Sequence, residues 1–137
     1  MAYSAFYARF FDFVDRLKEA FAEIFKLRAS FFYLAGFILW QIVVCIQVFL
    51  VKNNLSGDLV VLHYNVDFGI DLVANPSAIF FYPALSLAVF LINFLILLFF
   101  SRNKNLKILI HYLLSAAVLF SAFLSLVLLS IYLINFR

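Results

Sequence analysis

Charged residues are scarce in this chain of 137 residues, and so are glycine, proline and cysteine. Only 12% of the residues are Asp, Glu, Lys or Arg, while 68% are hydrophobic and the mean hydropathy is +1.13. A soluble domain is normally about a quarter charged, so the composition leaves no room for a soluble enzyme. The one cysteine, Cys45, cannot form an intramolecular disulfide. The composition predicts a single domain, residues 1–137, that lies in lipid.

Motifs of catalysis and cofactor binding are also absent. The sequence has no GxGxxG, no phosphate-binding Gly-Lys loop and no HExxH. Its three glycines are too few for a glycine-rich loop that binds a cofactor. The net charge of +3 does not indicate a nucleic-acid partner, because the cations stand mostly beside apolar runs and form no separate basic face. We therefore expect no catalytic residues, no cofactor, no metal and no bound nucleic acid.

Three long runs contain no Asp, Glu, Lys or Arg, and they cover residues 31–51, 78–100 and 108–136. A helix needs about 20 residues to cross about 30 Å of hydrocarbon, and each run is long enough. We therefore predict an all-α integral membrane protein with three transmembrane helices that contact the lipid bilayer. Residues 52–77 and 101–107 are the predicted loops.

Lysine and arginine flank these runs unevenly, and this predicts the direction of the helices. The segment before the first run and loop 101–107 are rich in cations, whereas loop 52–77 has one cation, Lys52, against three aspartates. Short loops rich in Lys and Arg remain in the cytoplasm. We predict a multi-pass protein of the cell membrane with a cytoplasmic N-terminus and an outer C-terminus. The cations on the inner side are Lys26, Arg28, Arg102, Lys104 and Lys107.

Residues 1–28 have the periodicity of an amphipathic helix. Apolar residues recur in alternating steps of four and three, and charged residues recur on the opposite side. The favoured interpretation is a helix in the inner membrane interface, with its aromatic side chains at the acyl boundary. The alternative is a helix that binds a partner or a second copy, since heptad spacing is also that of a coiled coil. The apolar stripe comprises Tyr3, Tyr7, Phe10, Val14, Leu17, Phe21 and Ile24.

The outer loop alternates between apolar and non-apolar residues from position 62 to position 72. A period of two predicts an extended segment, either a strand or a short hairpin, with one buried face. We expect the apolar face to lie on the outer ends of the helices, and Gly69 permits a bend. The apolar positions are Leu62, Tyr64, Val66, Phe68, Ile70 and Leu72.

The intervening positions form a candidate interaction face of the outer loop. They combine an imidazole, an amide and two carboxylates, which solvent or a partner can hydrogen-bond. A Zn²⁺ or Mn²⁺ site is the alternative, but side chains two positions apart on a strand lie about 6.6 Å apart and cannot share an ion without a fold-back. We therefore predict a polar face and no metal site. The face comprises His63, Asn65, Asp67, Gly69 and Asp71.

Gln41, Gln47 and Asn93 are the amides of the first two predicted spans. An amide in hydrocarbon needs a partner, so we predict hydrogen bonds between helices, with a polar pathway as the alternative. Pro83 is predicted to kink the second span. Small residues of the third span are predicted to pack closely against another helix, and they are Ala117, Ser121 and Ser125.

The motif His63-Tyr64-Asn65, followed by Gly69, Asp71 and then Pro83 in an apolar helix, resembles a short bacterial membrane domain of unknown function. That domain occurs in SdpI-type immunity and signalling membrane proteins, where the motif lies in an outer loop between two spans. The likeness covers residues 35–100. It departs from the family in lacking prolines before the histidine and in lacking the further spans of the immunity proteins. The resemblance implies a protein of the bacterial cytoplasmic membrane, and it does not carry over immunity function.

Three functions are compatible with these patterns. The first is a small non-enzymatic accessory or interaction protein, of the immunity or signalling kind, that contacts another membrane protein, a peptide or a second copy of itself. The second is a component of an oligomeric transporter or channel, with a path lined by the span amides and Pro83. The third, a membrane enzyme using His63 and the aspartates, has the least support, because no motif surrounds them. We expect the first.

Overall fold

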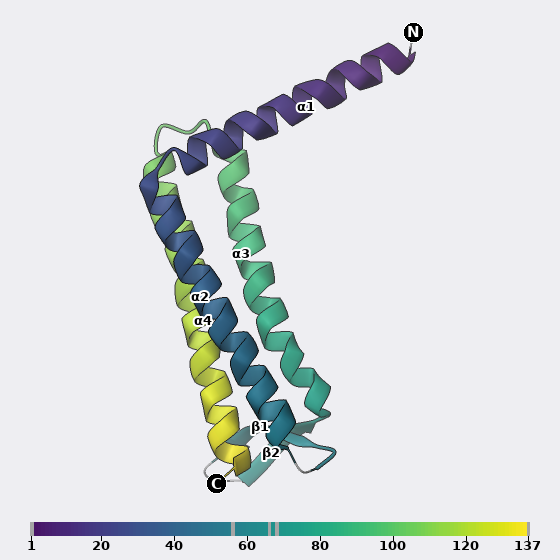
Figure 1. Ribbon diagram of the computed structural model, residues 1–137, viewed down its shortest axis with the longest axis vertical. Coiled ribbons are helices and arrows are strands. Elements are labelled where there is room, and N and C mark those ends of the chain that lie inside the picture. The colour runs from purple at the N-terminus through teal and green to yellow at the C-terminus, as the bar shows by residue number, and fades with distance from the viewer. Residues whose placement is uncertain (1, 56, 66, 68, 137) are drawn as a thin grey trace.

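A computed structural model of the chain describes residues 2–55, 57–65, 67 and 69–136, without the side chains of residues 2–6, 8 and 65. Figure 1 shows a bundle of three long helices, a further helix that leaves one end of the bundle, and a two-stranded hairpin at the other end. In chain order, the elements are α1 (Ala2–Phe25), α2 (Arg28–Asn54), β1 (Val60–Asn65), β2 (Gly69–Ala74), the 3-10 helix η1 (Pro76–Phe80), α3 (Phe81–Phe99) and α4 (Leu106–Phe136).

Three helices are long and apolar enough to cross a membrane, as predicted, and they are Arg28–Asn54, Pro76–Phe99 and Leu106–Phe136. α4 is the central one, because α2 and α3 both pack along it and contact each other much less. Its 31 residues correspond to about 46 Å at the helical rise of 1.5 Å per residue. α4 is therefore longer than the roughly 30 Å of a hydrocarbon layer.

α2 extends beyond its predicted apolar run at both ends, whereas α3 lies within its run, 78–100, and α4 starts two residues before its run and ends with it. α2 begins at Arg28 and ends at Asn54, whereas the run covers residues 31–51. Backbone hydrogen bonds continue a helix beyond the apolar residues, because charged and amide side chains at its ends reach into water. The composition therefore predicted the three helices, with bounds that differ from the observed ones by at most three residues.

Pro83 is the third residue of α3, in its first turn. The N–H groups of a first turn have no partner within the helix, so a proline there removes no hydrogen bond. Upstream, the Asn75 side chain accepts from the Ser77 N–H, and η1 passes into α3 at Phe81. The predicted kink inside the span is thus replaced by a change from 3-10 helix to α-helix before Pro83.

The bundle has two clusters of buried apolar side chains, one toward each end. In the cluster near α1, the rings of Phe37 and Phe90 stack with their centroids 4.1 Å apart. In the cluster near the hairpin, Val44 and Val48 of α2 pack with Leu128 of α4. The core therefore runs along the whole length of α4.

Small residues on α4 let α3 approach closely. Ala117, Ser121 and Ser125 are all buried, which confirms the predicted packing role. Ser121 Oγ donates to the Ala117 carbonyl at 3.0 Å and lies 2.7 Å from Ser86 Oγ on α3. Since a hydroxyl has one hydrogen, Ser86 is the donor in the bond between the two helices.

α1 is attached to the bundle by its C-terminal half and extends beyond α3 with its N-terminal half (Figure 1). Ile24 is fully buried, and the ring of Phe21 lies 5.4 Å from that of Phe94 on α3. Ser30 Oγ donates to the Ile24 carbonyl at 2.6 Å, which satisfies one of the free carbonyls at the helix end. The predicted apolar stripe thus packs on the bundle in its second half, whereas Tyr7 and Phe10 are exposed.

Candidate interaction surfaces

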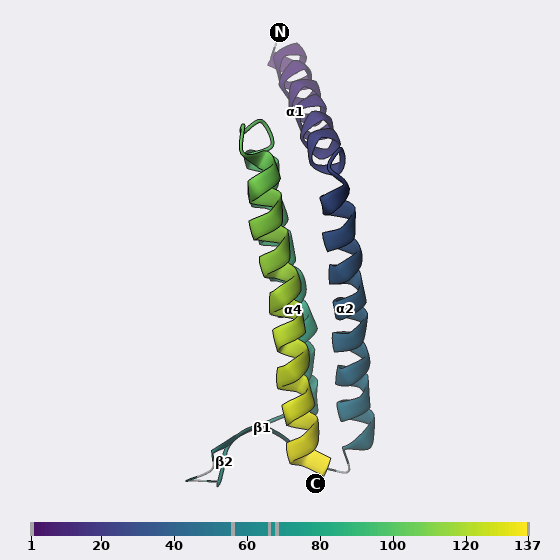
Figure 2. The ribbon, with the colours of Figure 1, turned by 90° about the vertical axis from the view of Figure 1, so that its left-hand side faces the viewer.

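The hairpin of β1 and β2 is antiparallel, and its base packs on the bundle through Val60, Leu62 and Ala74. Asn135, in the last turn of α4, accepts from the Val61 N–H at 3.0 Å and donates to the Val61 carbonyl at 2.8 Å. Val60 beside it is fully buried. From this base the hairpin projects sideways beyond α4 (Figure 2).

The apolar face of the hairpin is largely open. The exposed fractions are 49% for Tyr64, 59% for Ile70 and 52% for Leu72. Tyr64 and Ile70 are register partners and therefore share a face. The predicted contact with the helix ends is confirmed for Leu62, which packs against the buried cluster near the hairpin. It is wrong for Tyr64, Ile70 and Leu72, because the hairpin extends away from the bundle beyond its base. We call Tyr64, Ile70 and Leu72 the hairpin patch.

Two residues of the predicted polar face meet across the strands. His63 Nδ1 lies 2.7 Å from Asp71 Oδ1, and both side chains are exposed. Asp67 is exposed in the turn, and Gly69 has a φ of 79°, in the left-handed region that glycine favours. The Asn65 side chain lies outside the described part of the chain, as do Val66 and Phe68. The hydrogen bond between His63 and Asp71 accords with a polar face.

No group of three or more His, Cys, Asp or Glu side chains is arranged to hold a metal among the residues that the structure describes. The pair of His63 and Asp71 supplies two ligands, whereas a structural zinc site takes four.

The three amides of the bundle have different surroundings. Gln41 Nε2 donates to the Pro83 carbonyl at 3.0 Å, which is a bond between α2 and α3 as predicted. Asn93 Nδ2 instead donates to the Val89 carbonyl of its own helix, because its short side chain reaches the carbonyl four residues back. Within the described part of the chain, Oε1 of Gln41 and Oε1 of Gln47 are buried without a partner.

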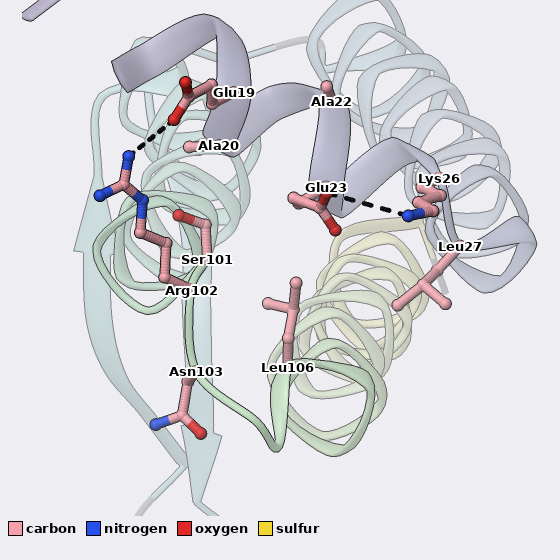
Figure 3. Close-up of a pocket in the computed structure, with 10 residues that line it drawn as sticks. All are labelled: Glu19, Ala20, Ala22, Glu23, Lys26, Leu27, Ser101, Arg102, Asn103 and Leu106. Atoms are coloured by element: carbon pink, nitrogen blue, oxygen red, sulfur yellow. Dashed lines mark hydrogen bonds and ion pairs between the residues drawn. The ribbon is translucent and has the colours of Figure 1, made fainter.

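An open hollow of about 890 Å³ lies between α1 and the loop after α3 (Figure 3). Its charged side chains pair with one another. Arg102 Nη2 lies 2.6 Å from Glu19 Oε2, and Lys26 Nζ lies 3.9 Å from Glu23 Oε1. All four side chains are more than half exposed, and such pairs contribute only about 0 to 1 kcal/mol. The four charges that line the hollow therefore sum to zero.

Asn135 and Ser86 make contacts that the sequence analysis did not identify. For Asn135 the sequence does contain a local signal, because an amide in the last turn of an otherwise apolar helix indicates a polar contact there. Ser86 has no comparable signal, because a serine in an apolar run bonds its own helix as readily as a neighbour. Neither contact partner, Val61 or Ser121, is near in sequence.

Comparison with known proteins adds no further information on function. No protein-family model, no curated protein and no solved structure matches this chain. The resemblance of residues 35–100 to the domain of SdpI-type proteins therefore stays a prediction.

Proposed function

We propose that this chain is a small non-enzymatic accessory protein of the bacterial cytoplasmic membrane that binds another membrane protein, or a second copy of itself, through its outer hairpin. The three long apolar helices support insertion as a multi-pass protein. The resemblance to the domain of SdpI-type membrane proteins supports the bacterial membrane as the location.

The distribution of charge supports the orientation. At the α1 end, Arg28 begins α2, and Arg102, Lys104 and Lys107 surround the turn into α4. At the hairpin end, the described aspartates outnumber Lys52. Cationic short loops stay in the cytoplasm, so the α1 end is cytoplasmic and the hairpin lies outside.

The hairpin patch is the observation that carries the proposed function. An isolated two-stranded hairpin is marginally stable in water, and this one also presents Tyr64, Ile70 and Leu72 with about half of each side chain exposed. Contiguous exposed apolar residues mark sites of interaction. The anchor from Asn135 holds the hairpin in one position, so its face is available to a partner without a large ordering cost.

Photocrosslinking and purification test this function. A photoreactive phenylalanine analogue placed at Ile70 is expected to give a discrete protein adduct in intact membranes. The same analogue at Leu119, which is 69% exposed on α4, is the matched control and is expected to give no such adduct. The protein identified in the adduct is expected to co-purify with the unchanged chain in mild detergent, and not with the double variant Ile70→Ser, Leu72→Ser. A lone monomer in mild detergent and no adduct at position 70 would contradict the proposal.

A component of an oligomeric transporter or channel is the second candidate. The buried carbonyl oxygens of Gln41 and Gln47, which have no partner among the described residues, favour it. Three helices form a thin wall, so a pathway requires several copies. Reconstituted vesicles should then show a solute flux that falls in Gln47→Leu, with Asn54→Leu outside the bundle core as the control. Vesicles that stay tight with the unchanged chain would eliminate this candidate.

A further inference from the structure

A second groove lies in the corner where α1 passes the end of α3, and it shares Ala20, Ser101 and Arg102 with the first hollow. The groove has a volume of about 430 Å³. Phe13, Arg16 and Leu17 line it from α1, and Leu95 and Phe99 line it from α3. Figure 1 shows how this corner arises, because α1 continues past α3 while α3 runs down the bundle.

The lining of this groove changes in character along α3. Leu95 and Phe99 lie on the apolar helix, with 52% and 87% of their side chains exposed. Arg16 and Arg102 stand where α1 crosses the end of that helix. A ligand that fills the corner must therefore have an apolar part along α3 and an anionic part beside the two guanidinium groups.

The two arginines have hydrogen-bonding capacity to spare. Arg16 has no hydrogen bond or ion pair to any residue within the described ranges. Arg102 bonds Glu19 through Nη2, and a guanidinium has five N–H donors. Such planar donors match the oxygens of a phosphate, often in a bidentate way. Glu19 is the competing acid in this corner.

We infer that the corner between α1 and α3 binds one anionic phospholipid, with its phosphate on Arg16 and Arg102 and its acyl chains along Leu95 and Phe99. This inference rests on the proposed insertion in the membrane, which puts the end of α3 at the level of the lipid headgroups. α1 as a whole is nearly neutral, so the attraction is local to the corner. A free phosphate would leave the apolar half of the groove uncovered.

Native mass spectrometry of the full chain in detergent, titrated with palmitoyl-oleoyl phosphatidylglycerol, tests the inference. Arg16→Gln and Arg102→Gln are each expected to weaken retention of one lipid by about tenfold, which corresponds to the loss of one charge-assisted contact. Glu19→Gln is expected to strengthen retention severalfold, because it frees Arg102. Arg9→Gln is the matched control, since it removes the same charge from the same helix outside the groove, and it is expected to retain the lipid.

Two ligand controls define the source of the phosphate. Palmitoyl-oleoyl phosphatidylcholine is expected to bind more weakly, because its headgroup also carries a cation, and inorganic phosphate is expected not to displace the lipid. Equal losses in Arg9→Gln and Arg16→Gln would overturn the inference, as would displacement by inorganic phosphate. Circular dichroism of each variant monitors folding. Reconstitution in nanodiscs separately tests insertion, so failure of the proposed membrane location is distinguishable from failure of the lipid site.

Discussion

The side-chain amide of Asn135 bonds both the N–H and the carbonyl of Val61, with distances of 3.0 and 2.8 Å. This pair of bonds is what a neighbouring strand would offer to β1, and it comes from the last turn of a helix 74 residues away in sequence. This amide therefore holds the base of the hairpin together with the buried side chain of Val60.

Replacement of this amide should loosen the base of the hairpin. Asn135→Leu keeps a similar volume but leaves the N–H and carbonyl of Val61 without their partner, at a cost of about 1 to 3 kcal/mol. We expect faster hydrogen–deuterium exchange at Val61 by at least about tenfold, measured by mass spectrometry in detergent. Asn54→Leu is the control, because the Asn54 amide bonds the Leu50 carbonyl of its own helix and no other group among the described residues. Equal exchange in both variants would contradict the anchoring role.

Close packing between α3 and α4 should make position 121 intolerant of large side chains. Ser121 is fully buried against Ser86, so Ser121→Leu forces the two helices apart at a cost of about 1 to 3 kcal/mol. Denaturation in mixed micelles, followed by circular dichroism, measures the loss. Ser130→Leu lies on the same helix, faces outward and bonds only the Leu126 carbonyl, so we expect a change within about 0.5 kcal/mol. Similar losses at both positions would argue against close packing at Ser121.

The three long helices could be predicted from the sequence because the signal is local. Length and hydropathy of a run suffice to identify a helix that can cross a membrane, and small residues at every fourth position of α4 indicated a contact face. The extended segment in the outer loop could be predicted as well, since alternation reports backbone geometry. In each of these cases the information lies within one stretch of the chain.

The sequence did not predict that the apolar side chains of the hairpin are exposed, because their exposure depends on contacts between residues far apart in the chain. Alternation shows that Tyr64 and Ile70 differ from their neighbours, but it does not show which surface they meet. Contacts distant in sequence, such as the bonds from Asn135 to Val61 and the packing of Val60 on the bundle, hold the base from which the hairpin projects. The register is also irregular around His63, and such bulges have no clear signal in this sequence. The corner between α1 and α3 depends in the same way on how α1 packs, which periodicity alone does not give.

Aromatic packing, more than the ion pair, should hold α1 on the bundle. The ring of Phe94 lies 5.4 Å from that of Phe21 and 6.2 Å from that of Phe25, and each aromatic pair is worth about 0.5 to 1.5 kcal/mol beyond its buried area. Phe94→Ala should therefore release α1 and speed tryptic cleavage at Arg16 severalfold. Arg102→Gln should change cleavage little, because the exposed pair with Glu19 contributes at most about 1 kcal/mol.

Phe123→Ala is the matched control for this experiment, since Phe123 is 59% exposed and lies in the C-terminal half of α4, away from the end of the bundle that carries α1. We expect tryptic cleavage at Arg16 to be as slow in that variant as in the unchanged chain. If Arg102→Gln released α1 and Phe94→Ala did not, electrostatic attraction would be the main attachment.

The orientation can be tested with single cysteines in intact cells. Cys45 is replaced by alanine first, because it is the only cysteine in the chain. Asp67→Cys, in the exposed turn of the hairpin, should react with a membrane-impermeant maleimide added from outside. Asn105→Cys, exposed in the loop between α3 and α4, should react only after the membrane is permeabilised if the orientation is the proposed one, with this cationic loop in the cytoplasm. Neither substitution changes a Lys or Arg, so neither alters the distribution of cations that determines the orientation. The opposite pattern would place the hairpin in the cytoplasm and expose the groove of Arg16 and Arg102 to the outer leaflet.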